Sequence, residues 1–296
     1  MISHGGLTFD PSFNAYKIVP SFDLMRLMIA LLMLASLVQM GFCQSKAGRE
    51  ELKAKVEKAF PDPPDMKRLV QDGRVWIDKA KRRVVVDGYV VLRRGSLEMF
   101  ACPVGTKEHE SVVALLSKAQ YVHAGLLAVG ALPGKPTKFD PYQPASGATI
   151  KISVLWRDEK GEKQTAKAQD WIKHAGADRA MTYDWVFAGS GIYKDEESRE
   201  EYYLAEGGDL ICVANFPSAT LDLAVRSNDT NAGLEFLAYT EKIPPEGTPV
   251  RLVLEVSDEP PARGSDPIKP GVLPDVVKPI EVPAIEAKPD PLRIKK

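Results

Sequence analysis

The chain has 296 residues, of which 44% are hydrophobic and 27% are charged, and its 39 basic and 40 acidic side chains give a net charge of −1. A balance this even excludes the strongly basic surface on which nucleic-acid-binding domains depend, so we expect no nucleic acid partner. The length suffices for one large domain or two small ones with a sizeable hydrophobic core.

An apolar run over residues 27–38 follows Arg26 and precedes a strongly polar chain. A positively flanked stretch of this length is typical of a secretory signal peptide, and it is shorter than the roughly 20 residues that span a bilayer as a helix. We therefore interpret residues 1–43 as a signal peptide with an extended n-region, in which Met25 fits the true start. The protein is expected to be exported to the periplasm or cell envelope.

Two alternatives to simple cleavage stay open at the end of this segment. Small residues at Gly41 and Cys43 favour a cut before Gln44, whereas lipidation of Cys43 would anchor the chain to a membrane. An apolar run extended through Phe42 would instead remain as an uncleaved anchor. Membrane contact is expected only through this N-terminal segment, in the last two cases.

Residues 44–65 are predicted to form a short amphipathic helix that ends at a proline-rich break. Leu52, Val56, Ala59 and Phe60 recur at helical spacing among lysines and glutamates, and three prolines follow within residues 61–64. We interpret this segment as a spacer between the membrane and the domain.

From residue 75 onward the chain changes to short β-branched and aromatic runs separated by charged or glycine-containing turns. Strands are predicted at 75–77, 84–86, 89–92 and 97–101, with the basic residues 79–83 as a solvated hairpin tip. Further strands are predicted at 149–156, 185–187, 202–204, 210–214, 221–225, 234–239 and 250–256.

Two helices are predicted between residues 106 and 130. Thr106 fits the N-cap of the first, in which apolar residues recur at spacings of three and four up to Ala119, and the second covers residues 122–129. The fold class is therefore α+β, with a mainly antiparallel β-sheet of sandwich or barrel form and termini of low structure. The globular domain is expected to span residues 66–256.

The segment 257–296 contains nine prolines and seven side chains of each charge, without apolar periodicity. Such a composition cannot build a core and favours extended polyproline conformations. We predict a proline-rich disordered tail.

The polar sequence over residues 106–111 is the best candidate site, because it joins a cysteine-bearing strand end to a predicted helix N-terminus. A helix N-terminus disfavours a protonated imidazole, so His109 is expected to be neutral and available as a ligand or base. An ordinary polar first turn explains the same residue types, and this alternative stays open. The candidate catalytic residues are His109, Glu110 and Glu108, and the candidate binding residues are Lys107, Ser111 and His123.

Cys102 and Cys212 lie outside the predicted leader, and in an oxidising compartment they fit either a disulfide or two separate buried thiols. Together with His109 and His123 they include enough ligand types for zinc, but their spacing matches no zinc motif and we expect no metal. Val113 occupies the position of the second histidine in the zinc-protease helix motif, so that motif fails. No cofactor is predicted.

Five segments occur in a characteristic order: GRVWID at 73–78, LEMF at 97–100, KEHES at 107–111, VHAGLL at 122–127 and LICVANF at 210–216. Together they resemble the YdjY-type domain of exported bacterial proteins over about residues 66–256. The resemblance implies a bacterial envelope setting and no particular reaction. Some relatives carry ferredoxin-type motifs beside this domain, but the required cysteine string is absent here, so no iron–sulfur cluster is expected.

Two functions stay open at this point. The preferred one is a non-catalytic domain that binds an envelope protein or a small ligand. The alternative is a metal- or thiol-dependent envelope enzyme centred on His109 and Glu110, with Cys102 as ligand or thiol. The alternative requires Cys102, Cys212, His109 and His123 to converge beside an open cleft.

Overall fold

The computed structural model describes residues 47–175, 178–227 and 236–262. The predicted signal peptide at 1–43, and the predicted tail beyond Ala262, lie outside this part of the chain. By contacts the chain divides into residues 1–51 and a compact unit of residues 52–296, and the description below concerns the second unit. Within the described residues, no helix combines the length and the apolar character needed to cross a membrane.

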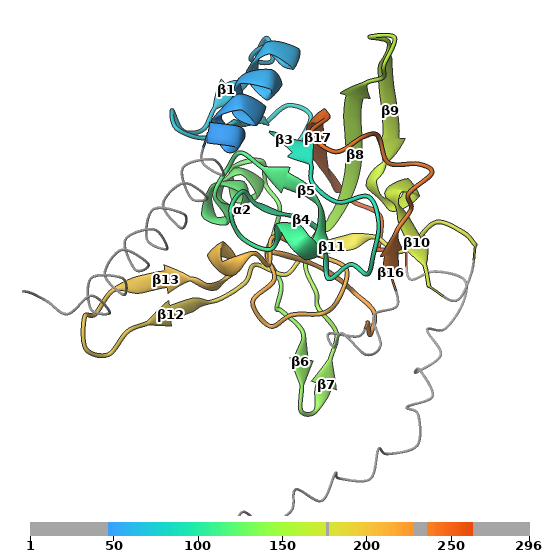
Figure 1. The fold of residues 1–296 in the computed structure, drawn as a ribbon. Helices are drawn as coiled ribbons and strands as arrows, with labels where there is room; N and C mark the ends of the chain where they lie inside the picture. The colour runs from blue at the N-terminus through green and yellow to red at the C-terminus, as the bar shows by residue number, and fades with distance from the viewer. Residues whose placement is uncertain (1–46, 176–177, 228–235, 263–296) are drawn as a thin grey trace, which may run out of the picture. The chain divides into compact units, whose positions relative to one another are not determined.

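The compact unit is built on a closed, barrel-like sheet of eight strands (Figure 1). Around the barrel these are β3 (Arg83–Val90), β17 (Pro249–Ser257), β8 (Thr149–Arg157), β11 (Trp185–Phe187), β15 (Leu221–Leu223), β14 (Ile211–Cys212), β4 (Met99–Pro103) and β5 (Ser111–Leu115), and β5 pairs back with β3. The pairs β14–β15 and β4–β5 are parallel, and the other neighbours are antiparallel. The predicted α+β class with a mainly antiparallel, barrel-like sheet is confirmed.

Shorter elements surround the barrel. β2 (Val75–Asp78) and β1 (Lys67–Arg68) extend the sheet from β3, and β9 (Lys163–Lys167) pairs with β8. Separate two-stranded ribbons are formed by β6 (Lys138–Phe139) with β7 (Tyr142–Gln143), β10 (Ile172–His174) with β16 (Phe236–Ala238), and β12 (Ile192–Lys194) with β13 (Glu201–Tyr203). The helical elements are α2 (Ala119–Ala128) and the 3-10 turns η1 (Glu108–Glu110), η2 (Ala168–Trp171) and η3 (Leu204–Gly207). The β12–β13 ribbon projects from the barrel (Figure 1).

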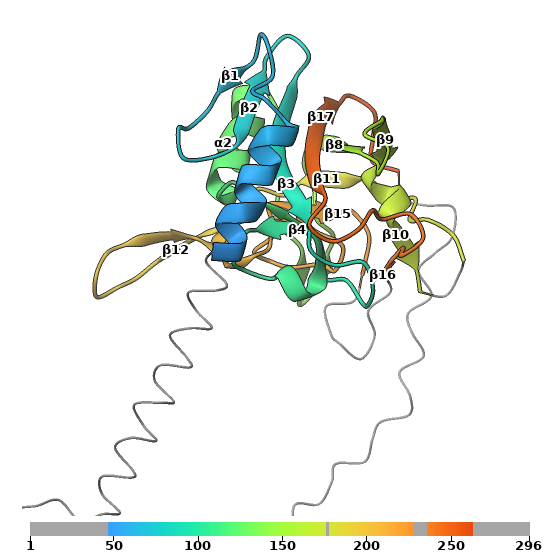
Figure 2. The ribbon, with the colours of Figure 1, turned by 45° about the horizontal axis from the view of Figure 1, so that its top comes forward.

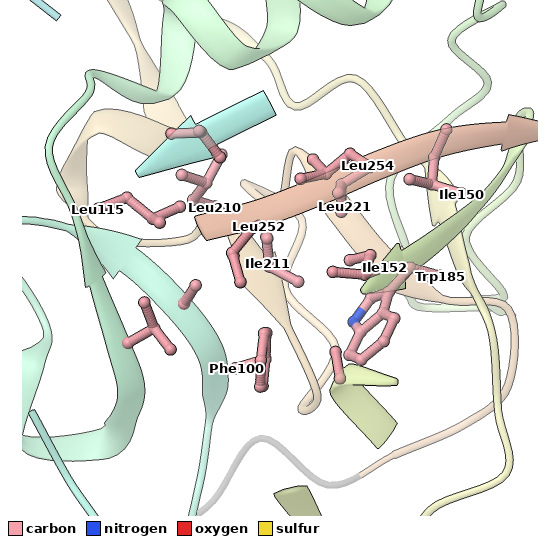
Figure 3. Packing of buried hydrophobic residues seen from close by; sticks show 14 of the residues in the cluster. Phe100, Leu115, Ile150, Ile152, Trp185, Leu210, Ile211, Leu221, Leu252 and Leu254 are labelled. Atoms are coloured by element: carbon pink, nitrogen blue, oxygen red, sulfur yellow. The ribbon is translucent and has the colours of Figure 1, made fainter. Parts of the chain in front are cut away.

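Large apolar side chains from several barrel strands meet in the interior (Figure 3). Phe100 of β4 lies 5.8 Å, between ring centroids, from Trp185 of β11, and both residues are fully buried. The indole Nε1 of Trp185 donates a hydrogen bond to the Cys212 carbonyl at 2.7 Å, which satisfies its buried polar atom. A side-chain-filled interior is typical of an eight-stranded barrel.

The predicted amphipathic helix is present over residues 47–59, and from Leu52 onward it belongs to the compact unit (Figure 2). Val56 is fully buried against Tyr89 of β3 and Ala114 of β5. The sequence predicts a spacer over residues 44–65 ahead of a domain that starts at residue 66. The packed unit starts earlier because the apolar face of this helix covers the barrel.

Two helical segments lie between residues 106 and 130, but the first is much shorter than the spacing predicts. Only the 3-10 turn η1 forms, and Ser111–Leu115 is the buried strand β5, paired with β4 and β3. Val112 and Val113 favour a strand, and a short apolar run cannot be assigned to helix or strand by periodicity alone. The second helix, predicted at 122–129, is confirmed as α2.

Candidate functional site

The polar cluster predicted as the best candidate site surrounds Lys107. Its Nζ lies 3.1 Å from Asp209 Oδ1, 3.4 Å from Glu98 Oε2 and 4.4 Å from the ring centroid of Phe216. Burial disfavours the ammonium charge, but Asp209, Glu98 and Glu110 outweigh it and raise the pKa of Lys107. The charge of Lys107 is thus neutralised within the protein, which favours a structural ion-pair network over a ligand-binding cation.

The other members of this cluster have local roles or are exposed. Glu108 Oε1 accepts a hydrogen bond from the Gly105 N–H at 2.6 Å, and Ser111 Oγ donates to the Lys107 carbonyl at 2.7 Å. The His109 side chain is 77% exposed, with Nε2 3.4 Å from Glu110 Oε1. An imidazole this exposed lacks the enclosure and orientation that tune a catalytic base.

Cys102 and Cys212 are both buried and both free. The disulfide considered from the sequence is therefore absent between them, because the β4–β14 ladder places Met99, and not Cys102, opposite Cys212. Burial raises the pKa of both thiols. A buried thiol with a raised pKa is a poor nucleophile, which argues against a thiol-dependent enzyme.

The four candidate metal ligands lie on four different elements. Cys102 is on β4, Cys212 on β14, His109 on η1 and His123 on α2. Within the described ranges, no group of three or more His, Cys, Asp or Glu side chains is arranged to hold a metal ion. The convergence that the enzyme alternative requires is not found there.

His123 instead lines a cleft of about 590 Å³, which we call the His123 cleft. Its lining residues are Gln120, His123, Gly189, Ser190, Gly191, Ile192, Glu201 and Tyr203. They come from α2, from the loop after β11 and from the β12–β13 ribbon. The volume falls within the range of about 300–1,000 Å³ that is typical of small-molecule sites.

Glu206 of η3 holds the N-terminus of α2. Its carboxylate accepts hydrogen bonds from the backbone N–H groups of Ala119 at 3.2 Å and Gln120 at 2.9 Å. These N–H groups have no partner within the helix itself, so an acceptor from another element both satisfies them and fixes the position of the helix. Gln120 and His123, three residues apart, then lie on one face of α2, toward the cleft.

The loop at Gly189, Ser190 and Gly191 contributes one wall of the cleft and has constrained backbone. Gly189 has φ +91°, and a Cβ at this position would lie 3.0 Å from the Pro133 Cβ, so glycine is required. Ser190 has φ +59°, and its Oγ donates to the Ser218 carbonyl at 2.6 Å. A non-glycine residue at positive φ is uncommon and often occurs at functional sites.

A row of three hydrogen-bonding side chains runs from the cleft into the buried core. His123 Nδ1 lies 2.9 Å from Tyr203 Oη, which lies 2.8 Å from Thr220 Oγ1. Burial raises the pKa of Tyr203 to about 12, and burial lowers the pKa of His123 below its usual 6.5. Both side chains are therefore uncharged near neutral pH, where each can still donate or accept a hydrogen bond.

Of the candidate binding residues predicted from the sequence, the structure places His123 in the cleft and leaves Lys107 and Ser111 outside it. The sequence patterns do not predict a role for Tyr203, Ser190 or Glu206. Tyr203 lies 80 residues after His123, and no local pattern links the two. The glycines around Ser190 were the available signal, because a glycine pair in a loop indicates special backbone geometry.

A family model described as the YdjY domain matches residues 75–255, which is more than half of the chain and includes every residue of the His123 cleft. No curated protein and no solved structure shows a significant match.

Proposed function

The chain belongs to the YdjY domain family, and we propose that this member is an exported envelope protein that binds a small ligand in the His123 cleft without catalysing a reaction. The observation that carries the proposal is the hydrogen-bonded pair of His123 and Tyr203, partly buried in an open cleft of small-molecule size. Clefts that combine apolar walls with a few convergent polar groups are the usual form of a ligand site.

The chemistry of the cleft indicates the class of ligand. His123 and Tyr203 supply uncharged hydrogen-bonding groups, while Ile192 supplies apolar surface. The carboxylate of Glu201 is already paired with Lys194 at 3.3 Å. A compact ligand with an uncharged polar group and an apolar body fits this arrangement best.

The absence of catalysis is proposed from the partner of His123. Its Nδ1 contacts the hydroxyl of Tyr203, whereas a catalytic histidine base is ordinarily oriented and strengthened by a carboxylate. With its pKa at about 12, the Tyr203 phenol also remains protonated at neutral pH and does not act as a base.

The binding proposal is tested with three small probes built on leucine: N-acetyl-leucinamide, which is neutral, N-acetyl-leucine, which is an anion, and leucinamide, which is a cation. We expect the neutral probe to shift the NMR signals of His123, Ser190 and Tyr203 most. Tyr203→Phe should weaken binding of the neutral probe by about 5- to 100-fold, because the loss of the hydroxyl leaves His123 Nδ1 and Thr220 Oγ1 without their partner.

Tyr202→Phe is the matched control, since Tyr202 neighbours Tyr203 on β13 but lies on the opposite face of the ribbon. The Tyr202→Phe variant should bind the neutral probe with the same affinity as the unaltered protein. If none of the probes perturbs the cleft signals, or if both phenylalanine variants bind alike, the cleft is not the ligand site.

Export is proposed from the apolar run at residues 27–38 behind Arg26. A fusion of residues 1–46 to alkaline phosphatase should be active, because this reporter requires an oxidising compartment. Replacing two of the leucines in the run by arginine should abolish the activity. A reporter that stays inactive with the unaltered leader would contradict export.

A further inference from the structure

The β12–β13 ribbon has a second face, which the His123 cleft does not use. Tyr193 lies opposite Tyr202 in the ladder, on the face away from Ile192 and Tyr203, which line the cleft. Tyr193 is 53% exposed and Tyr202 is 49% exposed. The ribbon itself projects from the barrel (Figure 1). Two exposed tyrosines paired across its strands offer more apolar surface than a single surface residue, and tyrosine is enriched at protein interfaces.

The outer edge of β12 has backbone groups available for another strand. The hydrogen-bonded pairs that flank the ladder are Gly191 with Leu204 and Asp195 with Glu200. Because hydrogen-bonded and non-hydrogen-bonded pairs alternate in an antiparallel ladder, the N–H and C=O groups of Ile192 and Lys194 point away from β13. In the part of the chain that the structure describes, no strand pairs with this edge.

The turn between the two strands is acidic. Residues 194–201 contain five carboxylates and two cationic side chains, which gives a net charge of −3. Positive charge on a partner that contacts this turn strengthens its binding, whereas the turn repels an anionic membrane surface.

We propose that the outer edge of β12 is a docking site for an extended segment of a partner protein that carries basic and apolar side chains. The segment adds to the edge as a third strand through main-chain hydrogen bonds. Its apolar side chains pack on Tyr193 and Tyr202, and its basic side chains lie beside the acidic turn. This goes beyond ligand binding in the cleft, because it uses the opposite face of the ribbon.

The test uses a short synthetic peptide of alternating lysine and valine and its glutamate–valine counterpart, each added to the isotope-labelled protein. The lysine peptide should shift the NMR signals of β12 and slow hydrogen exchange at the amides of Ile192 and Lys194. Its binding should weaken as the salt concentration rises. Equal binding of the glutamate peptide, or no binding of the lysine peptide, overturns the proposal.

Two pairs of variants separate the side-chain and backbone contributions. The double variant Tyr193→Ser with Tyr202→Ser should weaken binding of the lysine peptide about tenfold or more, whereas Phe139→Ser, on the β6–β7 ribbon, should leave it unchanged. Lys194→Pro removes the outward N–H and should abolish the added strand, while Lys194→Ala keeps the N–H and should bind. If the two variants of either pair bind the lysine peptide equally well, the proposal is overturned.

Two other occupants of this surface are outcomes of the same experiments. Binding of phosphatidylglycerol vesicles that is lost in the double tyrosine variant would assign the ribbon to a membrane surface. Self-association in sedimentation runs that is lost in the same variant would assign it to a second copy of this chain. Either result overturns the proposal of a basic partner segment.

Discussion

At the residue scale, Asp222 on β15 is a carboxyl group held away from water by neutral partners. Thr137 Oγ1 donates to its Oδ2 at 2.9 Å, and Asn215 Nδ2 donates to its Oδ1 at 2.9 Å. Burial raises the pKa of Asp222 from 3.8 to about 7. The folded state therefore keeps a proton that the unfolded chain releases, so the free energy of unfolding falls as the pH rises from about 4 to about 7.

We predict that Asp222→Asn removes most of this pH dependence. The asparagine keeps an oxygen acceptor for Asn215 and can donate its amide to Thr137 Oγ1, so the hydrogen bonds survive without the charge. Urea unfolding between about pH 4 and about pH 8 measures the slope. Asp258→Asn, at a highly exposed position, controls for the loss of one carboxylate. A slope that is unchanged in Asp222→Asn would refute the prediction.

The contribution of His123 to the free energy of unfolding changes with pH in the opposite direction. Burial lowers its pKa, so the folded state resists a proton that the unfolded chain takes up below about pH 6.5. Its contribution to stability is present above pH 6.5 and is lost as the pH falls through its lowered pKa.

An NMR titration of the imidazole signals tests this directly, and we predict a midpoint for His123 below 6.5. His123→Gln should reduce the loss of stability between about pH 7 and about pH 5, and His109→Gln controls for removal of an imidazole. A His123 midpoint at or above 6.5 would show that the cleft does not desolvate the ring.

At the scale of elements, a buried charge network fastens the helix of residues 52–59 to the barrel. Arg74 Nε and Arg251 Nε donate to the fully buried Asp87 of β3 at 2.9 and 2.6 Å. The same two arginines donate to the carbonyls of Phe60 and Pro61, where the helix ends. One network therefore joins the end of the helix to β3 and β17.

We predict that Arg74→Met lowers the free energy of unfolding by about 3 kcal/mol, because the buried Asp87 carboxylate then keeps only Arg251 of its two arginine partners. Urea unfolding measures the loss, and faster proteolysis within residues 47–59 would report release of the helix. Arg82→Met removes an exposed ion pair with Asp258 and should cost less than about 1 kcal/mol. Equal costs for the two variants would rule out the anchoring role.

At the scale of the whole molecule, packing around the sheet shields both free thiols from solvent, and Cys212 packs with Met99 and Ala219 outside the main core. Cys102 and Cys212 lie on the neighbouring strands β4 and β14, and both are fully buried. In a Cys43→Ser background, we predict that neither thiol reacts with Ellman's reagent in native buffer and that both react in denaturant. Reaction of one thiol in the native protein would contradict this shielding.

The elements that local patterns define were predictable. Most strands from β2 to β17, the turn at residues 79–82 and helix α2 follow from β-branched runs, charged turns and helical spacing. The runs at 84–86 and 89–92, predicted as two strands, are joined through Gly88 in the single strand β3. The segment around Val112 and Val113 was not predictable in the same way, because its environment inside the barrel decides between strand and helix.

The sequence by itself determined the α+β class and the mainly antiparallel sheet, since each depends on residues close together in the chain. Only the tertiary structure decided that β5 closes the barrel on β3, that the cysteines are separate buried thiols, and that Tyr203 and the β12–β13 ribbon complete the cleft. These features depend on pairing between residues far apart in sequence, which burial of the whole core selects and which no local periodicity encodes.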